Sequence, residues 1–423
     1  MKTIKSGEHR LCERDPETTR VVSEMLHELE AKGMDAVRRF SREFDGWDPA
    51  SFELSAEAIE AAASGLPQEA VRDTEHCQDN VRRFAEAQLA TLRPLELEIR
   101  PGVFLGHRHV PVDSAGCYVP GGLYPIFGSA HMSIIPSKVA GVRSVMACTP
   151  PVKGRGAYPA TVHAMARAGA DRIFVVGGVQ AVALMAFGLG GAEPVDVVCG
   201  PGNKYVTEAK RQLFGRCGID LLAGPSEVLI IADDTADPAL VASDLLAQAE
   251  HDPHSGACLV CFSEAFAGKA LAEVEHQMAE LATRKVAEQA WRDSGIVVVA
   301  DSADEAVAIS DGYAPEHLEI HTADPDSFAA RLANYGSLFI GEETTVAYGD
   351  NSIGTNHILP TGRAARYTGG LWVGTFLKTC TWQRMTPAAS REAGAIAERQ
   401  CRLEQMPGHA RSCRARVKRF GGT

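Results

Sequence analysis

Residues 144–215 decide the fold of this chain, because two kinds of segment alternate there. Short apolar, β-branched runs predict strands, and the segments between them carry apolar residues at helical spacing. In order they are SVMAC (144–148), PATVHAMARAGA (159–170), RIFVVGG (172–178), VQAVALMAFG (179–188), VDVVCGPG (195–202) and YVTEAKRQLFG (205–215). Such a strand–helix series predicts a parallel sheet covered by helices, the α/β class.

A second strand–helix series follows the first. Its segments are VLIIAD (228–233), PALVASDLLAQAE (238–250), ACLVCF (257–262), a long helix over about 265–293, IVVVA (296–300), a short helix near 303–309, LEI (318–320) and LFIG (338–341). Helical spacing over residues 21–44 and 55–92 precedes both series. After Pro360 the chain is turn-rich, then helical near residues 388–404, then short and basic.

The two series predict an α/β fold with two Rossmann-like parallel-sheet domains and small N- and C-terminal segments. The predicted divisions are an N-terminal arm (1–20), a discontinuous first α/β domain (21–117 and 227–365), a second α/β domain (118–226) and a C-terminal segment (366–423).

Composition narrows the class of protein. The 423 residues carry a net charge of −12, which makes nucleic acid and anionic membranes poor partners. No apolar run approaches the roughly 18 residues that cross a bilayer, and the start lacks a signal peptide, so we expect a cytoplasmic protein. The one CxxC pair, Cys258 and Cys261, lies in a predicted strand. Positions three apart in a strand face opposite ways, so we expect two packed thiols, not a metal site.

Four segments carry residues suited to chemistry. Gln248 and His251 share one face near a helix end, where they could hold a metal ion or be an ordinary helix terminus. Glu316 and His317 suit proton transfer if an irregular boundary lets both reach one site, or they are a surface pair. The other candidates are two pairs in turn-rich segments, Asp350 with His357 and Glu404 with His409.

Two Gly-rich turns stand between a strand and a helix, where backbone amides attract phosphate or polar cofactor groups. They are Gly177-Gly178 and Gly200-Pro-Gly202-Asn203. Neither is a GxGxxG motif, so by spacing alone they could be tight packing turns.

Together these segments resemble the histidinol dehydrogenase family across nearly the whole chain. The matching motifs, in family order, are GCYVPGG (116–122), VGGVQAVALMAFG (176–188), GPGNKYVTEAKRQ (200–212), IDLLAGPSEVLIIAD (219–233), DLLAQAEHDP (244–253), YAPEHLEI (313–320), YGDNSIGTNHILPT (348–361) and the pair Glu404 and His409. Each motif is unspecific alone, and the combination is highly specific.

The resemblance implies roles for individual residues. The positions matching the family's zinc ligands, one ion per subunit, are Gln248, His251, Asp350 and His409. Glu316 and His317 match its acid–base pair. The positions matching NAD contacts are Tyr118, Gln180 and Asn203. The substrate-binding set combines these ligands and His317 with Ser226, His357 and Glu404. Because the family takes His409 and Glu404 from the partner subunit, the resemblance implies a domain-swapped homodimer.

The implied chemistry takes a primary alcohol through a bound aldehyde to a carboxylate, with NAD accepting both hydrides. Zinc orients the alcohol oxygen and lowers its pKa. His317 takes the hydroxyl proton, and Glu316 activates the water that attacks the aldehyde.

Two segments depart from ordinary histidinol dehydrogenases. His131 stands where those enzymes usually have an aliphatic residue, and Trp372 and Thr375 stand where they tend to have a small residue and an acid. These features resemble a paralogous branch that includes sulfopropanediol 3-dehydrogenase, which oxidises 2,3-dihydroxypropane-1-sulfonate to sulfolactate. A sulfonate needs basic or hydrogen-bonding donors, so we expect His131 to contact the substrate.

Three alternatives stay open from the sequence. L-histidinol is the alternative substrate, and the retained acid Glu404 favours its cationic amine. The same metal-ligand set with an adjacent Glu–His pair could also serve a metal-dependent hydrolase. A metal-binding nucleic-acid module would use the basic tail at residues 411–419, which the acidic net charge disfavours.

Overall fold

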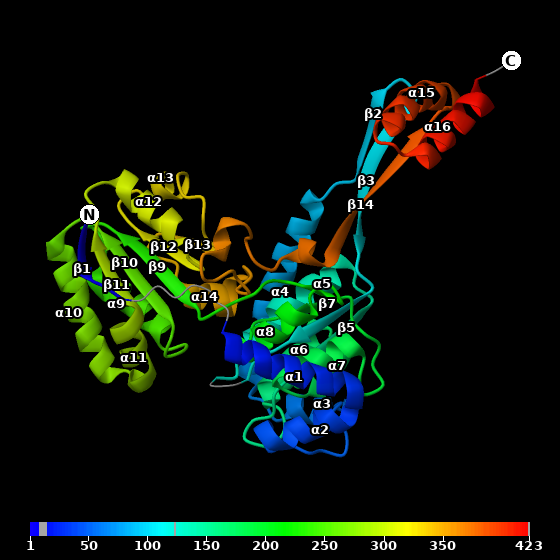
Figure 1. Cartoon of the computed structure of the whole chain (residues 1–423). Coiled ribbons are helices and arrows are strands. Elements are labelled where there is room, and N and C mark those ends of the chain that lie inside the picture. The colour runs from blue at the N-terminus through cyan, green and yellow to red at the C-terminus, as the bar shows by residue number, and fades with distance from the viewer. Residues whose placement is uncertain (8–14, 122–123, 422–423) are drawn as a thin grey trace. The chain divides into compact units, whose positions relative to one another are not determined.

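The structure, a computed structural model, describes residues 1–7, 15–121 and 124–421 (Figure 1). It divides into two compact units. Unit 1 comprises Met1–Ala87 and Val112–Phe376, and unit 2 comprises Gln88–Pro111 and Leu377–Thr423. Unit 1 holds both predicted strand–helix series and therefore most of the predicted site.

The first series forms a five-stranded sheet in unit 1. Its strands are parallel in the order β6-β5-β4-β7-β8 and are β4 (Ser114–Tyr118), β5 (Ser144–Thr149), β6 (Arg172–Val175), β7 (Val197–Cys199) and β8 (Gly218–Ile219). The helices between and beside them are α5 (Gly128–Ala140), α6 (Pro159–Ala168), α7 (Gly178–Phe187) and α8 (Lys204–Leu213). The prediction of a parallel α/β sheet from this stretch is confirmed.

The N-terminal helical region is broken where the sequence pattern was continuous. It contains α1 (Pro16–Lys32), α2 (Met34–Phe40), the π-helical turn η1 (Ser41–Asp45), α3 (Ala56–Ser64) and α4 (Gln68–Thr91). The first break is at Gly33, whose φ of +58° suits glycine, and the second precedes α4 at Pro67, which cannot donate a helical hydrogen bond. Apolar spacing alone therefore misses both boundaries.

Helix α1 packs against α7 and α8, beside the five-stranded sheet. The predicted first α/β domain places most of this helix with residues 227–365, whereas in the structure the helix packs beside the other sheet. The other predicted domain boundaries stay a prediction.

The second series forms a six-stranded sheet in the order β1-β11-β10-β9-β12-β13. Its strands are β1 (Lys2–Lys5), β9 (Glu227–Ala232), β10 (Gly256–Cys261), β11 (Gly295–Val299), β12 (His317–His321) and β13 (Ser337–Ile340). All neighbours pair in parallel except β1, which pairs antiparallel with β11. Part of the predicted N-terminal arm is thus an edge strand.

The connections of this sheet include α9 (Pro238–Ala249), α10 (Glu264–Glu280), α11 (Arg284–Ser294), α12 (Ala303–Tyr313) and α13 (Pro325–Ala329). The long helix expected over residues 265–293 is therefore wrong, because α10 and α11 are separate helices. After β13 come four short turns, α14 (Val346–Tyr348), η2 (Gly349–Ile353), η3 (Ala364–Arg366) and η4 (Val373–Phe376). Cys258 and Cys261 are buried in different apolar clusters, as expected of packed thiols.

Unit 2 contains a three-stranded antiparallel sheet and a helix pair. The sheet has the order β14-β3-β2, formed by β2 (Leu95–Arg100), β3 (Val103–Pro111) and β14 (Leu377–Met385), and the helices are α15 (Pro387–Leu403) and α16 (Pro407–Phe420). The sequence pattern predicts α15, but it does not predict any of the three strands. These strands contain few buried residues, and β14 pairs with the distant β3, as in the pair Met385 and Val103.

Both parallel sheets reverse their strand order at one point, between β4 and β7 in one and between β9 and β12 in the other. In open α/β sheets ligands bind beside the carboxyl ends of the strands at such a point. In the five-stranded sheet this edge carries Tyr118, the last residue of β4, and Gly200, directly after β7.

A buried ion pair holds the Gly200 turn. Lys210 and Asp220 form the pair, and their side chains are 3% and 0% exposed. The Lys210 Nζ donates to the Gly200 carbonyl at 3.0 Å, and the Gly200 amide donates to Asp220 Oδ2 at 2.8 Å. The two charges therefore fix both polar groups of one glycine.

We expect Lys210→Met to lower the free energy of unfolding by about 3–5 kcal/mol, because it leaves Asp220 charged and buried. Urea unfolding followed by circular dichroism measures this loss. Adding Asp220→Asn should recover part of it, because the buried charge is gone. Lys204→Met is the control, since Lys204 pairs with Asp15 at the surface and such pairs contribute roughly 0–1 kcal/mol. A double variant no more stable than Lys210→Met would contradict the role of the pair.

Candidate active site

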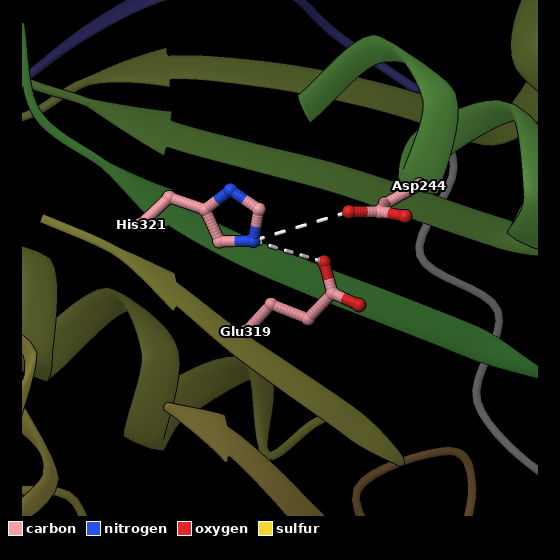
Figure 2. Close-up of side chains that lie close together, drawn as sticks. All are labelled: Asp244, Glu319 and His321. Atoms are coloured by element: carbon pink, nitrogen blue, oxygen red, sulfur yellow. Dashed lines mark ion pairs between the residues drawn. The ribbon is translucent and has the colours of Figure 1, made fainter. Parts of the chain in front are cut away.

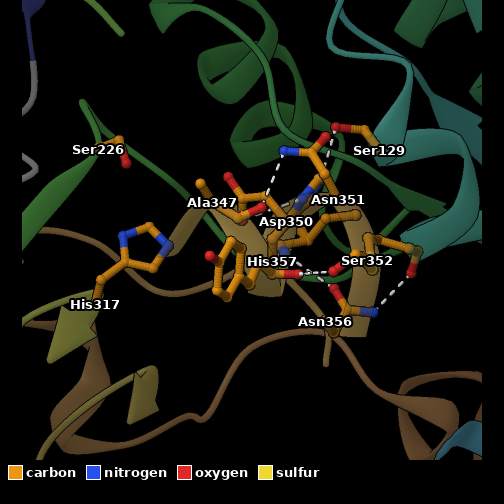
Figure 3. A network of polar contacts seen from close by, with 12 residues as sticks. Ser129, Ser226, His317, Ala347, Asp350, Asn351, Ser352, Asn356 and His357 are labelled. Carbon is orange, nitrogen blue, oxygen red and sulfur yellow. Dashed lines mark hydrogen bonds and ion pairs between the residues drawn. The ribbon is translucent and has the colours of Figure 1, made fainter. Parts of the chain in front are cut away.

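A pocket in unit 1 collects residues from the end of the second series. His317 is the first residue of β12, Asp350 lies in η2, and His357 follows in the next loop. The residues lining the pocket are His317, Ser337, Phe339, Gly349, Asp350, Thr355, Asn356, His357 and Leu359. Three sequence-predicted site residues therefore face one space, and Figure 3 shows the His317 ring directed toward the segment that carries Asp350 and His357.

His317 is arranged as a base. Its Nδ1 lies 3.1 Å from the Glu227 carbonyl oxygen, which can only accept, so Nδ1 carries the proton. Its Nε2 has no hydrogen-bond partner within the described ranges. Burial lowers the pKa of His317, so the imidazole is neutral near pH 7. A neutral ring with this tautomer presents the lone pair of Nε2.

The side chain of Glu316 lies in the same region as that of His317, although neighbouring side chains in a regular helix or strand point in different directions. Helix α12 ends at Tyr313 and is capped by Ala314, whose left-handed φ of +52° turns the chain before Pro315 and supplies the irregular boundary that the pair needs. Glu316 Oε2 accepts from Ser226 Oγ at 2.5 Å and from the Glu227 amide at 3.0 Å. Burial raises the pKa of Glu316 well above its usual range, and these hydrogen bonds act against that rise.

Asp350 and His357 are held together from two sides. The His357 Nδ1 lies 3.4 Å from Asp350 Oδ1, and its Nε2 lies 3.1 Å from Ser129 Oγ on α5. Burial would raise the pKa of Asp350, but His357 and the other nearby histidines lower it overall. A Cβ at Gly128 would stand 3.1 Å from the His357 ring, so glycine lets α5 approach. Ser129 itself was missed in the sequence.

Gln248 and His251 lie at the end of α9. Gln248 is 2% exposed, yet neither atom of its side-chain amide has a hydrogen-bond partner among the described residues. His251 follows the helix and is near enough to His317 and Asp350 to influence the pKa of both. Tyr124 Oη donates to the carbonyl of Glu250 at 3.2 Å, which ties the loop after β4 to this helix end.

The remaining predicted pair belongs to unit 2. Glu404 is the residue at the end of α15 and His409 lies in α16, and both are exposed. Unit 1 therefore holds three of the four predicted metal ligands, and the full ligand set stays a prediction.

His131 is buried within unit 1. It is 2% exposed, its Nδ1 lies 3.0 Å from the Gln78 side-chain nitrogen, and its ring meets Phe127 edge to face. Burial lowers the pKa of His131 to about 3, so the imidazole is neutral. A neutral His131 does not supply the positive charge that would pair with a sulfonate.

Trp372 and Thr375, which also marked the departure from ordinary family members, bond to each other. The Trp372 amide donates to Thr375 Oγ1 at 3.2 Å, and the Thr375 amide donates to the Trp372 carbonyl at 3.0 Å. They shape the η4 turn, and their contact with a substrate stays a prediction.

The predicted NAD contacts lie at the carboxyl edge of the five-stranded sheet. Tyr118 Oη accepts from the Gly178 amide at 3.3 Å, and burial raises the Tyr118 pKa to about 12. Asn203 Oδ1 caps α8, accepting two amides at 3.0 and 3.1 Å. Gln180 Nε2 donates to Asp45 Oδ2 at 3.1 Å. Asp45 is a further residue that the sequence analysis missed, because η1 brings it here from far away in the chain.

The fold and the site define an α/β protein in which a buried neutral imidazole and a buried carboxyl group lie beside candidate metal ligands. The family model described as histidinol dehydrogenase matches residues 9–417. The chain therefore belongs to the histidinol dehydrogenase family, and it is an oxidoreductase. This membership removes the hydrolase and the nucleic-acid module as interpretations. No helix within the described ranges is long and apolar enough to span a membrane.

Curated relatives and a solved structure agree with this assignment. The chain is 52% identical to a histidinol dehydrogenase homolog of Shouchella clausii, covering 99% of each chain. It is 47% identical to the sulfopropanediol 3-dehydrogenase of Ruegeria pomeroyi, covering 96% of this chain and 92% of that protein. The crystal structure of histidinol dehydrogenase from Elizabethkingia anophelis matches with a TM-score of 0.93 and 31% identity, over 98% of this chain and 95% of that one.

Proposed function

We propose that this protein is a zinc- and NAD-dependent dehydrogenase that oxidises a primary alcohol through a bound aldehyde to a carboxylate. The observation that carries the proposal is His317, a buried neutral imidazole whose Nε2 is unpartnered among the described residues and which lines the pocket with Asp350. A base of this kind suits the removal of a hydroxyl proton.

The residues present fit a zinc ion. A buried side-chain amide without any hydrogen bond is rare, and Gln248 has both amide atoms in that state within the described chain. His251 on the same helix end, and Asp350, whose pKa His251 influences, add the nitrogen and carboxylate ligands that zinc prefers. We propose Gln248, His251 and Asp350 as ligands from one chain and His409 as the fourth. When bound there, zinc would hold the alcohol oxygen and lower its pKa.

The carboxyl edge of the five-stranded sheet fits NAD. The helices α7 and α8 begin there, directly after glycine-rich turns, and helix N-termini attract phosphate. Asp45 adds a carboxylate beside Gly177. A carboxylate is the group that binds ribose hydroxyls in dinucleotide sites. We propose Tyr118, Gln180 and Asn203 as NAD contacts at this edge. NAD would supply the hydride acceptor for both oxidations.

The acid–base work divides between two adjacent side chains. His317 Nε2 takes the proton of the alcohol. The carboxylate of Glu316, oriented by the Ser226 hydroxyl, takes a proton from the water that attacks the aldehyde carbon. Overall one alcohol and one water give one carboxylate, two hydrides and three protons. Because Glu316 Oε2 lies 3.6 Å from His317 Nδ1, both groups could act on one bound aldehyde, which need not leave between the oxidations.

We propose that the active unit is a homodimer in which unit 2 serves the other subunit. Glu404 and His409 are exposed in their own chain, which leaves both able to contact a second copy. Unit 2 also exposes alternate apolar residues on one face of β2: Leu95, Leu97 and Ile99 are each about half exposed, at 49–52%. Such a patch is typical of a protein interface.

The proposed substrate is 2,3-dihydroxypropane-1-sulfonate. Its support is the 47% identity to a sulfopropanediol 3-dehydrogenase, against 42% to a relative named histidinol dehydrogenase. Because His131 is neutral, any contact with the sulfonate would be a hydrogen bond. L-histidinol is the second candidate, favoured by the exposed carboxylate of Glu404, which suits an amine.

The two acid–base residues should be separable by substitution. We expect His317→Ala to slow alcohol oxidation and Glu316→Gln to slow oxidation of added aldehyde, each by roughly 10²–10⁴-fold. Because the pKa of Glu316 is raised, its base form grows as pH rises, so wild-type aldehyde oxidation should increase with pH. Stopped-flow NADH formation across pH measures both effects. A Glu316→Gln enzyme with a normal rate and the same pH rise would exclude this role.

Mixed dimers test the origin of the fourth ligand. His251→Ala and His409→Ala subunits should each be inactive and lack the catalytic zinc. Mixing them should restore some activity, because one of the two sites in a mixed dimer collects both intact residues. Subunit exchange is verified by mass spectrometry with one labelled chain. If exchange occurs and activity stays absent, His409 acts within its own chain.

A parallel assay decides the substrate. We expect NADH to form from 2,3-dihydroxypropane-1-sulfonate with zinc and NAD present, with a kcat/KM well above that for L-histidinol. His131→Leu should reduce use of the sulfonate more than use of a neutral diol if His131 contacts the sulfonate. Turnover of L-histidinol alone, with no NADH from the sulfonate at millimolar concentration, would assign the chain to histidinol oxidation.

A further inference from the structure

A second polar cluster lies between α9 and β12. It consists of Asp244 on the helix and Glu319 and His321 on the strand, and we name it the Asp244 cluster (Figure 2). His321 Nε2 lies 3.5 Å from Glu319 Oε2 and 3.9 Å from Asp244 Oδ2. Glu319 and His321 are at most 1% exposed. None of the three belongs to the predicted catalytic set.

The atoms that face one another in this cluster lack ordinary hydrogen bonds. Glu319 Oε1 accepts from the Val346 amide at 3.1 Å, and Asp244 Oδ1 accepts from Thr345 Oγ1 at 2.9 Å. Those contacts fix each carboxylate by one oxygen. In the described part of the chain, Glu319 Oε2 and both ring nitrogens of His321 have no hydrogen-bond partner. Glu319 and His321 thus present three buried polar atoms without hydrogen-bond partners beside the partly exposed carboxylate of Asp244.

With both carboxyl groups ionised, the cluster would hold an excess of negative charge. Among the described residues, the ion-pair partner of both carboxylates is His321, with no lysine or arginine joining them. Two carboxylates and one imidazole cannot balance as two anions and one cation, and unbalanced buried charge is costly. A divalent cation would neutralise both carboxylates at once.

We propose that Asp244 Oδ2, Glu319 Oε2 and His321 Nε2 bind a divalent cation of the zinc or manganese class, separate from the catalytic metal. Ligand atoms around tetrahedral zinc lie about 3.4 Å apart, as bond lengths of about 2.0–2.2 Å require. The three atoms lie within 4.8 Å of one another, which small side-chain movements would close. A mixed set of two oxygens and one nitrogen suits either ion.

Such an ion would be structural and would support the catalytic residues indirectly. Its ligands join α9, which also carries Gln248, to β12, which begins at His317. The hydrogen bonds from Thr345 and Val346 add the start of α14, which leads directly to Asp350. One ion would therefore fix three elements that present active-site residues.

Metal content tests the proposal apart from activity. Chelator-stripped protein is dialysed against Zn²⁺ or Mn²⁺ and its bound metal is measured by mass spectrometry. We expect the His251→Ala chain, which lacks the proposed catalytic ligand, to retain one ion per chain. Adding Glu319→Gln to it should remove that ion, whereas adding Glu342→Gln, a matched loss of one acid in the neighbourhood of His321, should not. If the catalytic zinc proposal fails, Glu319→Gln still lowers the metal content by one.

Thermal unfolding supplies a second measurement. With chelator present, Glu319→Gln should melt higher than wild type, because it removes a buried charge. With metal added the order should reverse, since a bound ion stabilises only the chain that keeps its ligands. His321→Asn replaces Glu319→Gln if that variant does not fold. The proposal would be overturned if neither variant changed the metal content and added metal raised the melting temperature of wild type no more than that of the variants. That result would indicate that protons neutralise the cluster.

Discussion

The pairing of β12 with β9 is the contact on which the site depends. In its parallel register His317 stands opposite Val228, one residue after Glu227. This register lets the Glu227 carbonyl fix the tautomer of His317 and lets the Glu227 amide and Ser226 hydroxyl hold Glu316. A slip of one residue would turn His317 to the other face of the strand. The positions of His317 and Glu316, the proposed acid–base pair, therefore rest on backbone pairing.

The parallel strands of the two sheets follow the same order once the antiparallel β1 is set aside, and the two sheets use opposite edges. The five-stranded sheet places Tyr118 at a carboxyl end, where dinucleotide sites usually lie. The six-stranded sheet places His317 at the amino end of β12, and the cluster residue His321 at its carboxyl end. In β12 alternate residues share a face, so His317, Glu319 and His321 lie on one side while Leu318 and Ile320 pack in the core on the other. The pattern explains how one strand contributes to two polar sites.

The sequence predicted the regular parts of the fold well, because strand and helix periodicity is a local property. Both α/β series and the residues Glu316, His317, Asp350 and His357 were identified from short segments. Helix breaks at Gly33 and before α11 were missed, because apolar spacing continues across a break that one glycine or turn creates. The strands of unit 2 were missed because most of their residues are exposed, which weakens the apolar pattern, and because β14 pairs with the distant β3.

The sequence by itself determined the fold class and the family, and it predicted Glu316 and His317 as an acid–base pair. Only the tertiary structure decided the state of each group. It made His317 neutral with an open Nε2, buried His131 against Gln78, and brought Asp244 to Glu319 and His321. The physical reason is that motifs are encoded in neighbouring residues, whereas protonation, hydrogen-bond partners and burial depend on residues that are distant in the chain and meet only when it folds.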